Sequence, residues 1–194
     1  MPVKTADIVT FNVTDEQIQQ AINIRNERDS KYGNIFTEES TDMRYVGEIG
    51  EIIVNQALNM VSKENTIWHT EDVIKQPDFT FCGRTLDVKT VKRQVPIKPW
   101  YKAQITARHS ETEMDDLLFT CYEVPKKQLH ILGVMEKSEF LRLATYYGEG
   151  DFVHDDYQIR KGHEIYAIMI SKMTPIREYL RDQKRKFLTM KNVA

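Results

Sequence analysis

The sequence has few cysteines and no long apolar run, and these absences exclude several classes of protein. Its two cysteines, Cys82 and Cys121, lie far apart in 194 residues and belong to no CxxC pair. We therefore expect neither a disulfide framework nor a zinc ribbon, and a reducing compartment such as the cytoplasm fits best. No apolar stretch approaches the ~20 residues of a membrane span, so we expect no membrane partner. The first residues also lack the apolar core of a signal peptide.

Repeats, low-complexity tracts and Gly/Ser linkers are absent as well. The length suits a single domain over 1–194, in which we expect a helical appendage at 1–35, a core at 40–180 and a basic tail at 181–194. The sequence contains no Gly-rich phosphate loop and no Ser-His-Asp pattern. The histidines have no metal-ligand spacing, so we assign none of them to a site: His69, His109, His130, His154 and His163.

Basic residues are concentrated in two stretches, although the formal net charge is −2. Residues 84–108 contain seven basic residues and one acidic residue, and residues 172–194 contain seven and two. Such stretches can face a phosphate backbone, but the second can equally be a solvated helix face. Trp100 and Tyr101 could stack on an unpaired base, although packing in a core or loop is the interpretation that we prefer. The candidates for nucleic-acid contact in the first stretch are Lys92, Arg93, Lys98 and Lys102.

Hydrophobic periodicity predicts the order helix, helix, several strands, helix, strand, helix. This order is typical of an α/β or α+β arrangement with one mixed sheet. The expected strands are the runs 77–81, 85–91, 103–107, 117–122, 129–135 and 165–170, and an irregular loop is expected at 148–162.

Polar residues mark where the helices should begin. Thr14 and Gln17 form a capping box for the first helix. The second helix extends to about Val61, and the third covers 138–147. The expected caps of the later helices are Ser40, Thr41 or Asp42 for the second, Ser138 for the third, and Thr174 followed by Pro175 for the last.

The segment QPDFTFCGRTLDVKT at 76–90 has the pattern of a β-hairpin with a two-residue turn at Cys82 and Gly83. Glycine favours such a turn because it tolerates a positive φ. The register then pairs Asp78 with Asp87. Since side chains alternate between the faces of a sheet, one face carries Phe79, Phe81, Leu86 and Val88. The other face carries Asp78, Thr80, Thr85, Asp87 and Lys89.

This register places two carboxylates side by side, which is unfavourable in a sheet. At ~4 Å and an effective dielectric constant of ~20, the repulsion between Asp78 and Asp87 is about 4 kcal/mol before relaxation. A divalent cation reverses the argument, because hard carboxylate oxygens suit magnesium or manganese. Lys89 adds a positive group beside the same spot. The alternative is a surface hairpin whose acids and lysine pair with each other in water.

The expected second helix contains the run GEIGE at 47–51. A glycine inside a helix costs up to about 1 kcal/mol relative to alanine. Two glycines here, Gly47 and Gly50, suggest that the helix approaches a sheet closely and brings Glu51 to the carboxylate pair. Glu48 could serve instead, and helix glutamates usually face solvent.

Together these residues resemble the PD-(D/E)XK nuclease superfamily, which includes restriction endonucleases and many phage, repair and recombination nucleases. The resemblance is carried by GxxGE on a helix, PD at the start of a hairpin and DVK on its return strand, and it covers about residues 44–180. It implies a restriction-endonuclease-like central mixed β-sheet flanked by helices. A compact protein of this kind would suit a bacterial or phage-infected cell.

The resemblance also implies roles for individual residues. Asp78 would be the principal metal ligand and Asp87 the second carboxylate, with a contribution from the main-chain carbonyl of Val88. Lys89 would orient or activate the attacking water. Glu51 would bind the metal directly or through water.

The expected function is a magnesium- or manganese-dependent endo- or exodeoxyribonuclease, in which the cation activates water and neutralises phosphate and Lys89 adds positive charge. DNA rather than RNA is what the resemblance implies. Gln104 matches loosely a glutamine that follows the lysine strand in some members. A structure- or end-specific nuclease and a small homodimeric endonuclease both remain open. So do two alternatives: an inactive nuclease-fold nucleic-acid-binding or assembly protein, and an RNA-processing nuclease.

Overall fold

The computed structural model describes residues 4, 7–32, 43–70, 76–98, 100–154 and 157–191 of the chain. This described part contains four α-helices: α1 (Asp15–Tyr32), α2 (Val46–Ser62), α3 (Lys137–Leu143) and α4 (Ile176–Lys191). Among the described residues, no helix combines the length and apolar character that crossing a bilayer requires.

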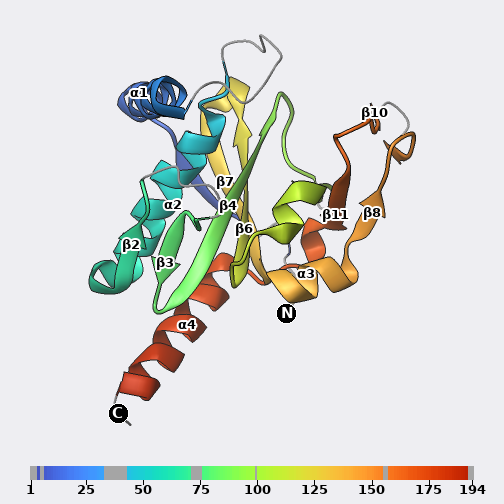
Figure 1. Ribbon diagram of the computed structural model, residues 1–194. Helices are drawn as coiled ribbons and strands as arrows, with labels where there is room; N and C mark the ends of the chain where they lie inside the picture. The colour runs from blue at the N-terminus through green and yellow to red at the C-terminus, as the bar shows by residue number, and fades with distance from the viewer. Residues whose placement is uncertain are drawn as a thin grey trace.

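Six strands form one central sheet in the order β1-β7-β6-β4-β3-β2 (Figure 1). Neighbouring strands are antiparallel except β4 and β6, which are parallel, so the sheet is mixed as the sequence predicts. The strands are β1 (Val9–Asn12), β2 (Thr66–Trp68), β3 (Phe79–Phe81), β4 (Arg84–Arg93), β6 (Asp116–Glu123) and β7 (Gln128–Glu136).

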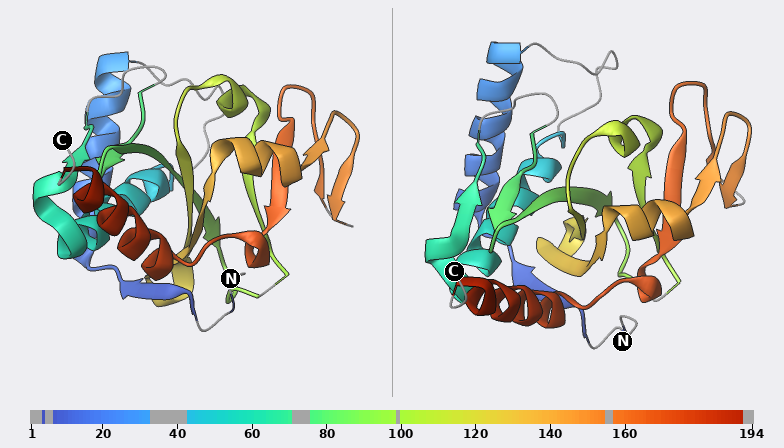
Figure 2. Two further views of the ribbon diagram at one scale, coloured as in Figure 1. Left: turned by 90° about the horizontal axis from the view of Figure 1, so that it is seen from below. Right: turned by 60° about the horizontal axis from the view of Figure 1, so that its bottom comes forward.

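Two smaller sheets and four short 3-10 helices complete the described part of the fold. A three-stranded sheet has the order β5-β11-β8, and a two-stranded sheet pairs β10 with β9. In Figure 2 the strands β8, β9 and β10 lie on the opposite side of the molecule from α1. The strands are β5 (Lys102–Thr106), β8 (Thr145–Tyr147), β9 (Phe152–His154), β10 (Tyr157–Gln158) and β11 (Ile165–Met169). The 3-10 helices are η2 (Lys63–Asn65), η3 (Ala107–Glu111), η4 (Val124–Lys126) and η5 (Ile170–Lys172).

The two faces of the central sheet are covered by different elements. Leu86, Val88 and Leu118 on one face pack with residues of α2 and α4. Leu117 and Phe119 on the other face pack with residues of β5, β11 and α3. The fold is therefore a mixed α/β arrangement in which helices flank a central sheet, as the sequence predicts (Figure 1).

The predicted hairpin is present with the predicted register. Cys82 and Gly83 form the turn with φ of 48° and 77°, and two positive φ values match a tight turn that follows the twist of its strands. Phe81 pairs with Arg84, Thr80 with Thr85, and Phe79 with Leu86. The apolar face of the hairpin is buried against α2 and α4.

The capping box of α1 is confirmed by both of its hydrogen bonds. The Thr14 N–H donates to Gln17 Oε1 (3.0 Å) and the Gln17 N–H donates to Thr14 Oγ1 (3.2 Å). The remaining helix starts were predicted less well. The proposed caps of α2 at 40–42 lie outside the described residues, and α2 begins at Val46 after Tyr45, with no side-chain cap.

Helix α3 begins and ends away from the predicted residues, whereas α4 begins within one residue of its predicted start. Helix α3 begins one residue before Ser138, and its N-cap position is Glu136. It ends at Leu143 because the chain then becomes extended, and residues 145–147 form β8. Helix α4 begins at Ile176, and the carbonyl of Pro175 accepts the Tyr179 N–H (3.0 Å).

Each predicted strand coincides with an observed one, but several strands were missed. The segment 148–162, predicted to be an irregular loop, contains β9 and β10. Strands β1, β2 and β8 were also not predicted. These strands have only three or four residues each, too few for alternation to be a clear signal.

Candidate functional site

The site lies at the edge of the central sheet, where β3 stops and β4 continues. Strand β3 begins at Phe79, opposite Leu86, whereas β4 extends to Arg93. Asp78 directly precedes β3, and its Oδ2 accepts a hydrogen bond from the Val88 N–H (2.6 Å). If β3 were longer, one of its backbone carbonyls would accept the Val88 N–H. Here the Asp78 carboxylate accepts it instead.

Asp87 and Lys89 lie on the opposite face of β4 from Leu86 and Val88. The carboxyl group of Asp87 is buried, with 7% of the side chain exposed, and Lys89 Nζ lies 2.6 Å from its Oδ2. This oxygen has no hydrogen-bond partner within the described residues, since the lysine contact has the distance but not the angles of a hydrogen bond. A buried carboxylate oxygen without a hydrogen bond is costly, and here it already attracts one cation, the Lys89 ammonium.

The electrostatics of Asp78 show that the predicted crowding of carboxylates is present. Burial raises the pKa of Asp78 well above its ordinary value, and repulsion from Asp87 and then from Glu51 raises it further. Lys89 and the Val88 N–H act in the opposite direction. Asp87, Glu51 and Lys89 therefore all lie close enough to act on the carboxyl group of Asp78.

Helix α2 brings Glu51 to this position, but an arginine already binds it. Glu51 is only 7% exposed. Arg28 of α1 donates from Nη1 to Oε1 and from Nη2 to Oε2, both at 2.9 Å. The indole N–H of Trp68 donates to Oε2 (3.3 Å). Sequence reasoning identified neither Arg28 nor Trp68, because their partner is distant in sequence.

The usual expectation that helix glutamates face solvent is wrong here. Glu48 is fully buried. It accepts hydrogen bonds from Arg25 and from Arg28, the latter at 3.0 Å. Glu48 therefore joins α2 to α1 through two arginines.

One of the two helix glycines has the predicted function. A Cβ on Gly50 would overlap the hydroxyl of Thr90 on β4 and lie 3.2 Å from that of Thr120 on β6. A Cβ on Gly47 would meet no atom within 4 Å. Gly50 alone therefore permits the close approach of α2 to the sheet that positions Glu51.

The donor set suits a hard cation only in part. Because the N–H and C=O of a strand residue point to the same side, the Val88 carbonyl also points toward Asp78. Asp87 Oδ2 has no hydrogen-bond partner among the described residues but lies 2.6 Å from Lys89 Nζ, and both Glu51 oxygens are bound by Arg28. Accordingly, no group of three or more His, Cys, Asp or Glu side chains arranged to hold a metal ion occurs among the described residues. The oxygen ligands that this part of the chain could offer to a cation are therefore Asp78, Asp87 and the Val88 carbonyl, whereas Glu51 is engaged by Arg28.

The predicted nucleic-acid contacts differ in how far their side chains are engaged. Lys92 and Lys98 are exposed, and Lys98 Nζ lies 5.4 Å from the centre of the Trp100 ring. The Arg93 guanidinium lies 4.1 Å from the centre of the Tyr101 ring. Lys102 Nζ donates to the Tyr147 hydroxyl (2.6 Å) and the Val153 carbonyl (3.3 Å), so it is held within the small sheets.

Trp100 and Gln104 do not lie as expected. Trp100 is 63% exposed, so the packing interpretation is wrong for this residue. Gln104 alternates along β5 with Ala103 and Ile105, which pack toward the central sheet. Gln104 therefore points away from the central sheet, and the structure does not bring it to the carboxylate pair.

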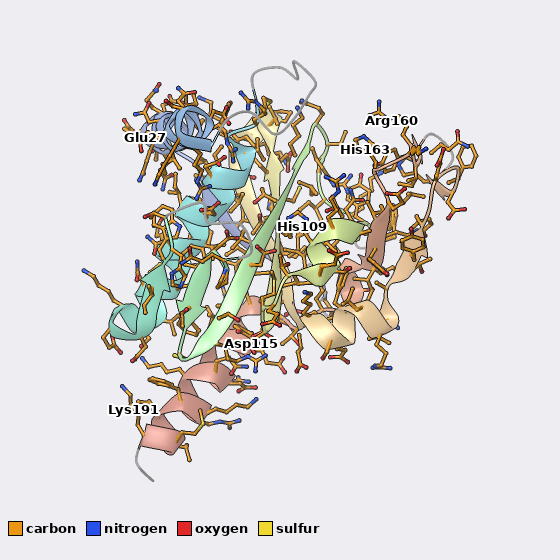
Figure 3. The ribbon with its side chains drawn as sticks, in the orientation of Figure 1. Glu27, His109, Asp115, Arg160, His163 and Lys191 are labelled. Carbon is orange, nitrogen blue, oxygen red and sulfur yellow. The ribbon has the colours of Figure 1, made fainter. Side chains whose placement is uncertain are left out.

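Two basic side chains that no sequence pattern singles out lie near Asp87 and Lys89. The charges of Lys89 and Asp87 act on both His109 and Lys137. Figure 3 shows His109 on η3, on the opposite side of β4 from α2. The Thr106 hydroxyl lies 2.7 Å from His109 Nδ1. No sequence spacing connects these residues to the DVK strand, because tertiary packing alone brings them together.

Comparison with known proteins adds no family to this geometry. No family model matches the sequence, and no curated protein matches it significantly.

Proposed function

We propose that this protein is a divalent-metal-dependent nuclease that hydrolyses phosphodiester bonds in DNA. The proposal depends on one observation above all: Asp78 and Asp87 lie close together at the point where two strands part, and the buried Oδ2 of Asp87 has a lysine at 2.6 Å but no hydrogen-bond partner among the described residues. A purely structural hairpin gains nothing from such repulsion, and rules of local stability are broken most often at functional sites.

Each residue has a role that its position supports. Asp78 and Asp87 would hold a magnesium or manganese ion, which would polarise the phosphate and supply an activated water. Lys89 would place its ammonium at the phosphate oxygens, where negative charge accumulates in the transition state. Glu51 would position water or metal once Arg28 releases it. The resemblance to PD-(D/E)XK nucleases supports the same roles.

The test is cleavage of supercoiled plasmid and linear duplex DNA with magnesium, with manganese and with a chelator. We expect cleavage only with a divalent ion. We expect Asp87→Asn and Lys89→Met to lose it, because Asn lacks the ligand charge and Met lacks the ammonium. The matched control is Glu139→Gln, an exposed acid whose partner Arg142 is also exposed, which should cleave as the unaltered chain does. Cleavage that persists in both site variants would refute the site.

A second candidate function is favoured by one specific observation. Both Glu51 oxygens are bound by Arg28, as expected if the fold binds nucleic acid without cleaving it. This alternative predicts DNA binding without cleavage under any divalent ion, and binding unaffected by Asp87→Asn. The same cleavage assay on structured RNA separates a ribonuclease from both.

A further inference from the structure

A buried lysine lies at the same end of the central sheet as the carboxylate pair. Register places Asp87 beside Leu117, and Leu117 beside Met135, in one row across β4, β6 and β7. Lys137 follows Met135 by two residues and begins α3. Its backbone N–H donates to the Asp115 carbonyl (2.9 Å). The first turn of α3 is thus fixed at the end of β6, close to Asp87.

Asp115 also connects the first turn of α3 to β4, the strand that carries Asp87. Its carboxylate accepts hydrogen bonds from the Thr85 N–H (2.8 Å) and the Thr85 hydroxyl (3.0 Å). The Asp115 N–H donates to the same hydroxyl (2.8 Å). In Figure 3 Asp115 lies near the lower ends of β4 and β6. Lys137 is therefore attached to a rigid part of the sheet and not to a mobile loop.

The ammonium of Lys137 lacks an acidic partner. The residue is 8% exposed, and its Nζ donates to the Thr112 carbonyl. Among the described residues no carboxylate forms an ion pair with it, so at least one of its three donors is available. Burial lowers the pKa of Lys137, and the charges of Asp87 and Glu113 oppose this effect. A buried ammonium without a paired anion is costly, which is the situation expected when the anion belongs to a ligand.

A groove next to Lys137 gives a ligand access to this ammonium. It has a volume of about 640 Å³. Its four lining hydroxyls already donate within the chain, those of Thr85 and Ser138 to carboxylates and those of Ser110 and Thr112 to backbone carbonyls. The Lys137 ammonium is therefore the donor that the groove offers to a ligand. Two of the groove's acids, Glu111 and Glu113, are exposed, and Asp115 is bound by Thr85. The lining includes Thr85, Ser110, Thr112, Lys137 and Ser138.

We propose that Lys137 binds a substrate phosphate next to the one that is cleaved, on the η3 and α3 side of the Asp78–Asp87 pair. Lys89 and Lys137 then contact successive phosphates of one strand, while the acids hold the cation. A lysine ammonium is a donor that phosphate contacts commonly use. This inference rests on the proposed nuclease function. It adds the direction in which the bound nucleic-acid strand leaves the site.

The test compares Lys137→Met with a matched control, Lys126→Met. Lys126 follows the far end of β6 and is 54% exposed. Binding of a fluorescent duplex oligonucleotide is measured in chelator from ~50 to ~200 mM salt. Losing one phosphate contact should lower the slope of log affinity against log salt by about 0.9. It should also weaken binding about tenfold, the loss expected for one charged hydrogen bond. The control should change neither quantity.

A second measurement uses the unaltered chain, so that the inference can be tested even if Lys137→Met does not fold. A buried, hydrogen-bonded ammonium exchanges its protons slowly, so the ¹⁵N-lysine signal of Lys137 should be observable and should shift when the oligonucleotide is added. An unshifted signal, or an unchanged salt slope in a folded Lys137→Met, would overturn the inference. If the unaltered chain neither binds nor cleaves DNA, the proposed function itself fails. Normal cleavage with an unchanged slope overturns only the role of Lys137.

Discussion

Arg28 holds Glu51 by two parallel hydrogen bonds, Nη1 to Oε1 and Nη2 to Oε2, each 2.9 Å long. The pair joins the N-terminal helix α1 to the helix that carries the candidate site. Arg28 also binds the buried Glu48, which Arg25 binds as well, so two guanidinium groups of α1 face two carboxylates of α2. Helix α1 therefore supplies the positive charge beside Glu51, even though it contributes no expected ligand.

Removing this guanidinium should destabilise the fold strongly. In Arg28→Ala, Glu51 and Glu48 lose a shared partner while they stay buried, and breaking a buried pair from one side costs about 3–5 kcal/mol. Urea unfolding measures the free energy of unfolding. Arg142→Ala is the control, since Arg142 and its partner Glu139 are exposed, and we expect a change within about 0.5 kcal/mol. Equal, small losses in both variants would show that the α1–α2 ion pairs contribute little.

The two glycines of α2 should respond to alanine in opposite directions. Gly50→Ala places a methyl group against Thr90, and overpacking of this kind costs about 1–3 kcal/mol. Gly47→Ala meets open space and should gain up to about 1 kcal/mol of helix propensity. Thermal unfolding of both variants measures the difference. Adding Thr90→Ala to Gly50→Ala should recover part of the loss, whereas simple additivity would contradict the proposed contact.

Local features of the sequence were sufficient to predict the hairpin and its register. Alternation with period two and the turn at Cys82 and Gly83 depend only on neighbouring residues, and both were found as predicted. The capping box of α1 is equally local. The bounds of α3 were predicted less well, because the residues after Leu143 have a helical pattern but pair with β11 instead.

The chemistry around the hairpin could be predicted only in part. Crowding of Asp78 against Asp87 follows from strand register, and the position of Glu51 follows from Gly50. The residues that complete the site depend on which elements pack together, and a single sequence has no periodic signal for that. The missed residues are Arg28 on α1, Trp68 on β2, His109 on η3 and Lys137 on α3.

The charge of Asp78 should make the metal-free protein less stable as pH rises. Burial first, and repulsion from Asp87 and Glu51 second, raise the pKa of this carboxyl in the folded state, while the unfolded chain keeps a value of about 4. Stability is then lost as pH rises from about 4 through the raised pKa, because the folded state resists losing the proton. Asp78→Asn should remove this slope and raise Tm at neutral pH in chelator.

A divalent metal ion should reverse the order of the Tm values of the unaltered chain and Asp78→Asn. Added magnesium or manganese should raise the Tm of the unaltered chain and leave that of Asp78→Asn unchanged, since the amide lacks the ligand charge. A lower Tm for Asp78→Asn in chelator would mean that the carboxylate is well satisfied without a cation.

The pKa of His109 should respond to the charges of Asp87 and Lys89. Burial lowers its pKa below 6.5, Lys89 lowers it further, and Asp87 raises it. Asp87→Asn should therefore lower the pKa of His109, and Lys89→Met should raise it, as measured by NMR titration. His130 is the control, because burial lowers its pKa while its partner is Glu123. If neither variant changes the pKa of His109, the imidazole lies farther from the pair than the structure places it.

The amide of Val88 donates to a carboxylate where a neighbouring strand would normally supply a carbonyl. Its hydrogen exchange is therefore governed by Asp78 and not by opening of the ladder, and it can be followed residue by residue in solution. An ion or a substrate that draws Asp78 away would speed exchange at this amide, while the amides between β4 and β6 stay protected. This single backbone proton can thus report occupancy of the site without any measurement of turnover.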